Sequence, residues 1–131
     1  MAQYILDTDI ASYLIRGDHE AVTKKFSELY DSCVISSITA AELQYGAKKR
    51  NNKQLTQKVK AFCDLVEIVP WDEDAAKAYA KLRVELETSG TPIGNMDMLI
   101  AASALARKAV LVTNNTEHFS RIKDLKLNNW C

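Results

Sequence analysis

Proline and glycine are scarce in this chain, with two prolines and four glycines among 131 residues. Such a composition argues against a flexible linker and against a loop-rich all-β fold. Cysteine is scarce as well: Cys33, Cys63 and Cys131 are odd in number and lack the spacing of metal ligands. We therefore expect neither a disulfide framework nor a zinc site, and a reducing, cytoplasmic location fits best.

Long apolar segments are missing too. The longest apolar run, residues 98–106, contains a serine and is too short to span a bilayer. The N-terminus leads directly into a predicted strand with no basic leader, so we expect no signal peptide and no membrane partner. Positive and negative residues balance at 17 each, and 47% of residues are hydrophobic. These values indicate a globular protein with one core.

Short apolar strands and amphipathic helices alternate along the chain. The hydrophobic pattern predicts strands at 4–6, 33–35, 67–69 and 110–112, with a last extended piece at 125–127. It predicts helices at 9–15, 19–30, 39–49, 53–65 and 72–88, a buried helix opening near residue 97, and a turn at 116–121. In the second helix, the side chains expected to face inward are Val22, Phe26, Leu29 and Tyr30. Such alternation predicts one α/β domain over residues 1–131, with a mainly parallel sheet of four to five strands flanked by helices.

Asp7 stands at the end of the first predicted strand, where open parallel sheets bind ligands. Thr8 and Asp9 follow and could cap the next helix. That capping would leave Asp7 free for chemistry, although Asp7 itself could also be the cap.

Three further polar residues are predicted at the same edge of the sheet. Glu42 lies three residues after Thr39, which is the spacing of a capping box, so a structural role is an open alternative for it. Asp97 opens the buried helix and Asn115 follows the fourth strand. Carboxylates gathered there would repel one another, and a hard cation such as Mg²⁺ would relieve that repulsion. A cation bound there could activate water for phosphodiester cleavage.

Basic residues crowd one stretch that contains no acid between Glu42 and Asp64. They are Lys48, Lys49, Arg50, Lys53, Lys58 and Lys60. Such a run is ordinarily a solvated helix face, and it indicates nucleic-acid binding only where it borders an acidic cleft.

Four motifs in order resemble the PIN-domain ribonucleases of the VapC type, which are toxins of bacterial toxin–antitoxin modules. They are Leu6-Asp7-Thr8-Asp9-Ile10; the segment from Ile35 to Leu43 with Tyr45-Gly46; the segment from Pro92 to Asp97 with Ile100-Ala101-Ala102; and Leu111-Val112-Thr113-Asn114-Asn115 with Phe119. The resemblance covers essentially the whole chain. Two positions depart from it: Asp9 stands where many relatives have Asn, and Asn115 stands where some have Asp.

The resemblance implies an Mg²⁺-dependent endoribonuclease, in which Mn²⁺ can substitute, acting on RNA and specifically on tRNA, with the anticodon loop as the expected region. It implies a homodimer and a cognate VapB-type antitoxin. It assigns Asp7, Glu42 and Asp97 as metal ligands and, with Asn115, as the catalytic set. Thr113 and Asp9 would support that set, and Lys48, Lys49 and Arg50 would contact RNA.

Two other functions are compatible with parts of the sequence. Asp7-Thr8-Asp9 after an apolar strand also resembles the nucleophile motif of HAD-type phosphohydrolases. That alternative lacks an acidic pair after the fourth strand and leaves Glu42 and Asp97 without a role. The other alternative is a PIN module that binds RNA or an antitoxin without catalysis.

Overall fold

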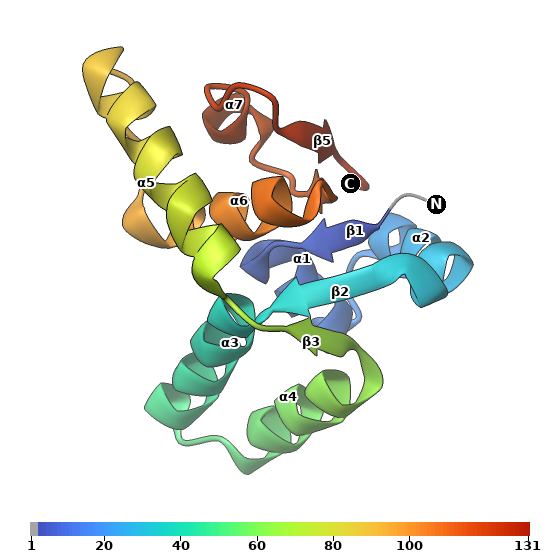
Figure 1. Ribbon diagram of the computed structural model, residues 1–131. Helices are drawn as coiled ribbons and strands as arrows, with labels where there is room; N and C mark the ends of the chain where they lie inside the picture. Colours follow the sequence, from blue (N-terminus) through green and yellow to red (C-terminus); the bar gives the residue numbers. More distant parts are fainter. Residues whose placement is uncertain (1–2) are drawn as a thin grey trace.

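Five parallel strands form one sheet at the centre of the molecule (Figure 1). The computed structural model describes residues 3–131. The strands are β1 (Tyr4–Leu6), β2 (Cys33–Ser36), β3 (Glu67–Val69), β4 (Val110–Val112) and β5 (Lys126–Asn128). Their order in the sheet is β3-β2-β1-β4-β5, and every neighbouring pair is parallel. The predicted α/β architecture is confirmed, and the extended piece near the C-terminus is the fifth strand.

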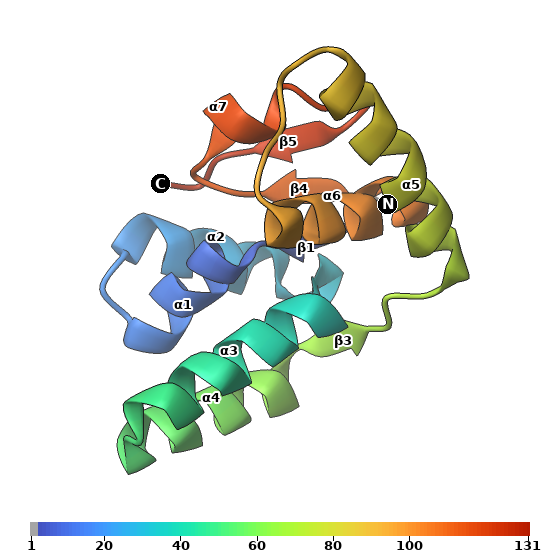
Figure 2. The ribbon, with the colours of Figure 1, turned by 90° about the vertical axis from the view of Figure 1, so that its left-hand side faces the viewer.

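Helices connect the strands and cover both faces of the sheet (Figures 1 and 2). They are α1 (Thr8–Arg16), α2 (Glu20–Leu29), α3 (Ser37–Arg50), α4 (Lys53–Leu65), α5 (Glu73–Thr88), α6 (Asn95–Arg107) and α7 (Thr116–Phe119). A 3₁₀ turn, η1 (Tyr30–Ser32), leads from α2 into β2. No helix within residues 3–131 has the length and apolar character needed to cross a bilayer.

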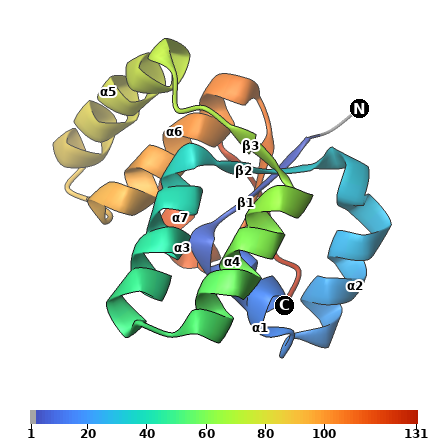
Figure 3. The same cartoon turned by 90° about the horizontal axis from the view of Figure 1, so that it is seen from below.

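Two hydrophobic clusters fill the space on either side of the sheet. Leu6, Ile35 and Val112 face the cluster formed with α1–α4, which lie together in Figure 3. Their strand neighbours Ile5 and Leu111 face the opposite cluster, formed mainly with α5 and α6. This alternation follows from the two-residue repeat of a strand, and it explains why the strands are apolar on both faces.

One turn and one strand end near β2 differ from the sequence-based prediction. Tyr30 was expected to face inward at the end of α2, but it begins η1 and is 40% exposed. Its ring packs edge-on against Phe26, and its hydroxyl donates to the carbonyl of Leu65 at 2.6 Å. The polar end of the side chain therefore draws Tyr30 to the surface. β2 also extends one residue further than expected, to Ser36.

The order of the strands creates a switch point beside β1. From β1 the chain adds β2 and then β3 on one side, and it returns to add β4 and β5 on the other side. In open α/β sheets, ligands bind at such a point, outside the carboxyl ends of the strands. Asp7 follows the carboxyl end of the central strand β1.

Candidate active site

Asp7 is a buried acid at the switch point, with 5% of its surface exposed. Its backbone N–H donates to the carbonyl of Val112 at 3.0 Å, which extends the β1–β4 pairing by one residue. Its Oδ1 accepts from the N–H of Ile10 at 2.9 Å, so Asp7 caps α1. The expectation that Thr8 and Asp9 would cap this helix and leave Asp7 free was therefore wrong. One carboxyl oxygen is nevertheless enough for the cap.

The environment of Asp7 disfavours its charged form. Burial raises the pKa of Asp7 to about 6, against the lowering effects of hydrogen bonds from the Thr113 hydroxyl and the Ile10 N–H. Repulsion from Asp9 and Asp97 is a smaller cause of the same raised pKa. A buried carboxyl with a raised pKa and like-charged neighbours is characteristic of functional sites.

Asp97 lies in the first turn of α6 and faces the same group of acids. The helix begins at Asn95, two residues earlier than expected, and its N-cap is Gly94. Burial is the main cause that raises the pKa of Asp97, and repulsion from Asp9 adds to it, while the neighbouring His118 lowers it. Asp9 thus acts on both Asp7 and Asp97, although its own side chain is exposed.

Glu42 is not part of a capping box. Helix α3 begins at Ser37, before Thr39, and Ser36 caps it by accepting from the N–H of Ile38 at 3.1 Å. The cap falls on Ser36 because β2 passes into α3 without an intervening loop. The side chain of Glu42 is bound by Thr8, whose hydroxyl donates to Oε1 at 2.5 Å. This bond joins the first turn of α1 to α3 and holds Glu42 against the residue that follows Asp7.

Asn115 and Thr113 lie together after β4. Thr113 is fully buried, and its Oγ1 accepts from the N–H of Asn115 at 3.0 Å. The side-chain amide of Asn115 lies 2.9 Å from Nδ1 of His118. Thr113 therefore connects Asp7 with the loop that carries Asn115, and His118 connects that loop with Asp97.

The predicted acids therefore lie in the same region, and they differ in how directly they interact. Asp7, Asp9 and Asp97 interact through their charges, and Glu42 joins them through Thr8. Among residues 3–131, no three His, Cys, Asp or Glu side chains are already placed to hold a metal ion together. Oxygen donors of this kind suit a hard divalent cation, and a cation would relieve the repulsion around Asp7.

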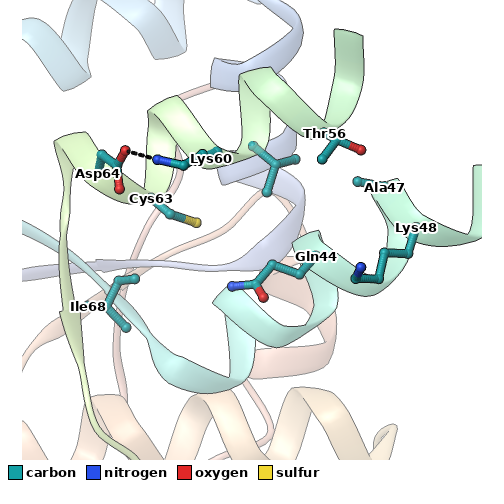
Figure 4. Close-up of a pocket in the computed structure, with 9 residues that line it drawn as sticks. Gln44, Ala47, Lys48, Thr56, Lys60, Cys63, Asp64 and Ile68 are labelled. Carbon is teal, nitrogen blue, oxygen red and sulfur yellow. Dashed lines mark hydrogen bonds and ion pairs between the residues drawn. The ribbon is translucent and has the colours of Figure 1, made fainter. Parts of the chain in front are cut away.

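The three basic residues expected to contact RNA point to different places. Arg50 lines a pocket of about 140 Å³ that also contains Thr8 and Glu42. Lys48 lines a separate pocket of about 420 Å³ between α3 and α4, shown in Figure 4. The Nζ of Lys49 lies 5.9 Å from the ring centroid of Tyr45. Of the three, Arg50 is the one that shares a pocket with a predicted site residue.

Two residues near the site had no role in the sequence-based prediction. Thr8 was seen only as a helix cap, because its partner Glu42 is distant in the sequence and no local pattern marks the pair. His118 was left without a role because a lone histidine is ordinarily structural or exposed. Its position three residues after Asn115 was the available signal.

Comparison with known proteins identifies the family. Residues 4–125 match the PIN domain family. The chain is 42% identical over 130 residues to Ribonuclease VapC2 of Rickettsia felis, with 97% of each chain covered.

The chain belongs to the VapC ribonucleases of the PIN domain family.

Two further relatives agree with this assignment. The tRNA(fMet)-specific endonuclease VapC of Salmonella typhimurium is 35% identical over 132 residues, with both chains fully covered. In its crystal structure, VapBC2 from Rickettsia felis is bound to a DNA fragment from its promoter. One of its chains superposes on this protein with a TM-score of 0.91, and the two sequences are 40% identical. That match covers 98% of each chain.

Membership in the PIN family decides between two of the earlier alternatives. PIN domains are nuclease folds that work with divalent metal ions, so this chain is an enzyme of that class. The phosphohydrolase alternative is thereby excluded, in agreement with the amide-bearing sequence Thr113-Asn114-Asn115 after β4. The donor set around Asp7 and Asp97 fits the hard cation that the family uses.

Proposed function

We propose that this protein is an Mg²⁺-dependent endoribonuclease that cleaves tRNA and serves as the toxin of a toxin–antitoxin pair. The observation that carries the proposal is the buried Asp7 at the switch point, crowded by Asp9 and Asp97. The 42% identical relative is named a ribonuclease and the 35% identical relative a tRNA(fMet)-specific endonuclease. Initiator tRNA is therefore the first substrate to test, with the anticodon loop as the expected cleavage region.

In this proposal Asp7, Asp97 and Glu42 hold the cation. When bound, Mg²⁺, or Mn²⁺ in its place, neutralises charge on the phosphodiester and makes a water more acidic. Asp7 is held by its cap to Ile10 and by Thr113, so one of its oxygens is fixed before the cation arrives. Asp9 adds negative charge that strengthens attraction of the cation.

Glu42 is the residue that we assign to the attacking water. Because Thr8 binds Oε1, the carboxylate is oriented, and its Oε2 can accept a proton from a water at the phosphodiester. Asn115 and Thr113 orient water beside Asp7 through the loop after β4. Among the basic residues we assign RNA contact to Arg50, while contacts by Lys48 and Lys49 stay predictions.

The partner is proposed from the structures that this chain resembles. The chain with a TM-score of 0.91 comes from VapBC2, a complex crystallised on promoter DNA. We propose a cognate VapB-type antitoxin that blocks the acidic site, a homodimer of this chain, a cytoplasmic location, and a single PIN domain that spans residues 1–131.

The testing experiment is cleavage of total RNA and then of purified initiator tRNA, with Mg²⁺, with Mn²⁺ and with EDTA. Asp97→Asn should abolish cleavage. Asp72→Asn is the matched control, because Asp72 also opens a helix, its Oδ1 accepts from Ala75 N–H, and Asn caps equally well. Discrete fragments that require metal and vanish only in Asp97→Asn support the proposal. RNA binding without cleavage under every condition would instead favour a non-catalytic binding module.

A further inference from the structure

A pocket that includes Glu42 lies where α1 and α3 meet, and α4 closes one side of it. Its inner end is formed by Thr8 and Glu42, and its outer end by Arg16 and Arg50. Its volume of about 140 Å³ is many times the roughly 10–15 Å³ that a single water needs. The pocket is therefore large enough for a chemical group of the substrate, and Glu42 of the proposed reaction centre is part of its lining.

The two arginines stand at matching positions on two helices. Helices α1 and α3 begin at the carboxyl ends of β1 and β2. Arg16 follows Thr8, and Arg50 follows Glu42, by the same number of residues. With a rise of 1.5 Å per residue, Arg16 lies about 12 Å along α1 from Thr8, and Arg50 lies about 12 Å along α3 from Glu42. Cations at that distance match a phosphate beyond the one that is cleaved.

Gly46 keeps this pocket open. It lies in the middle of α3 and lines the pocket, between Glu42 and Arg50. A Cβ built at Gly46 would meet no atom within 4 Å, and its φ is not in the left-handed region. Glycine is unfavourable inside a helix, and neither packing nor backbone conformation requires it here. The open space is thus the feature that glycine provides.

The two cations are not equivalent. Arg16 donates from Nε to Asp18 at 3.0 Å, and its guanidinium lies 5.2 Å from the ring centroid of Tyr13. Arg50 is exposed and takes part in none of the ion pairs found within residues 3–131. Arg50 is therefore the stronger candidate for binding an anion, with Arg16 in support.

We propose that this pocket binds a phosphate of the RNA strand next to the cleaved bond, through Arg50 and Arg16, and that Gly46 admits the nucleotide. The proposal rests on the proposed ribonuclease function. Arginine binds phosphate through paired N–H groups. The apolar side chains of Ile15 and Leu43, with Leu55 and Val59 of α4, suit the flat surface of a base or ribose.

The test compares variants on two sides of α3. Gly46→Leu fills the proposed subsite, and Gln44→Leu adds the same side chain in the separate α3–α4 pocket, where Figure 4 shows Gln44 and Lys48. Gly46→Leu should raise KM for tRNA about tenfold or more while thermal unfolding shows a folded protein; Gln44→Leu should not. Arg50→Gln should raise KM for tRNA about tenfold. It should also reduce the slope of log binding constant against log salt concentration by about one, as expected for one lost phosphate contact, and both effects should exceed those of Lys48→Gln.

Phosphate contact is tested directly with methylphosphonates. Each oligonucleotide carries one neutral phosphate. Binding is measured to the Asp97→Asn variant, which is expected to bind RNA without cutting it, and to the same variant carrying Arg50→Gln. One position beside the cleavage site should weaken binding only where Arg50 is present. Equal losses in both proteins at every position would overturn the proposal.

The outcomes separate this proposal from the one on which it rests. If the unmodified protein cuts no RNA, the ribonuclease function fails, and the binding measurements still decide the pocket. If it cuts RNA and the Gly46 and Arg50 variants behave like their controls, the subsite alone is wrong. If these variants keep normal KM but escape inhibition by the antitoxin, the pocket is an antitoxin contact and the RNA proposal is overturned.

Discussion

At the level of single residues, Asp7 combines two roles in one carboxyl group. It caps α1 through Ile10, and it lies among the acids at the switch point. A cap is satisfied equally well by an amide oxygen, but binding of a cation needs the charge. The two roles can therefore be separated by one substitution.

Asp7→Asn should stabilise the metal-free protein at neutral pH. The pKa of Asp7 is raised from 3.8 to about 6 in the folded state, so the folded protein binds this proton more tightly than the unfolded chain. The stabilisation that results from this one group is complete below pH 3.8 and is lost as the pH rises through 6. The cost in the wild type above pH 6 is about 3 kcal/mol at most. Denaturant unfolding in EDTA should show the variant gaining over wild type as the pH rises from 4 to 8. A variant that is less stable at pH 8 would contradict this account.

Thr8 should act through Glu42. Thr8→Val removes the hydroxyl that donates to Glu42 Oε1, and a hydrogen bond to a charged group is worth about 1.5–3 kcal/mol. We expect kcat to fall by about tenfold or more while KM for tRNA changes little. Thr8→Ser should restore most of kcat because it keeps the hydroxyl. Equal activity of all three proteins would mean that Thr8 does not position Glu42.

At the level of elements, most helices and strands could be predicted, but the starting points of α3 and α6 could not. β3, β4 and α4 have the predicted bounds, because each is an apolar pattern between clear breakers such as Asn52 and Pro70. The start of α3 was misplaced because Ser36 and Thr39 are both good caps. Choosing between them required knowing that β2 passes directly into the helix.

Helix α3 offers a measurable stability prediction at Gly46. Gly46→Ala should raise the free energy of unfolding by about 1 kcal/mol, because the backbone is helical and the new Cβ meets no atom within 4 Å. For a chain of this size the midpoint of thermal unfolding should rise by roughly 4 °C. The comparison is Ala47→Gly on the same helix, which should lower the midpoint of thermal unfolding. A loss of stability in Gly46→Ala would show that the space at this position is smaller than described.

At the level of the whole molecule, the strand order brings the acids together. Asp7, Glu42 and Asp97 could be chosen from the sequence because each was predicted at a strand end or a helix start, although Glu42 lies in the second turn of α3. Their mutual arrangement could not be predicted, since it depends on β1 lying between β2 and β4. The Thr8–Glu42 bond, and the placement of Lys48 and Arg50 in different pockets, are likewise products of helix packing.

Binding of the cation should be visible in the stability of the whole protein. A ligand that binds only the folded state stabilises it by about 2.7 kcal/mol at a hundredfold excess over Kd. Mg²⁺ should therefore raise the unfolding midpoint of wild type in a concentration-dependent way. Asp97→Asn should abolish that response, while Asp72→Asn keeps it. An equal response in wild type and Asp97→Asn would place the cation elsewhere.

The central strand β1 pairs with β4, whose residues come near the other end of the chain. During synthesis, a growing chain that has delivered α3 carries Asp7 and Glu42 but has neither Asp97 nor Thr113. Non-local parallel pairing of this kind forms late, after the intervening chain is available. Unfinished polypeptides of this protein thus lack an assembled acid site, and the ribosome that makes this ribonuclease meets the complete site only when translation is almost finished.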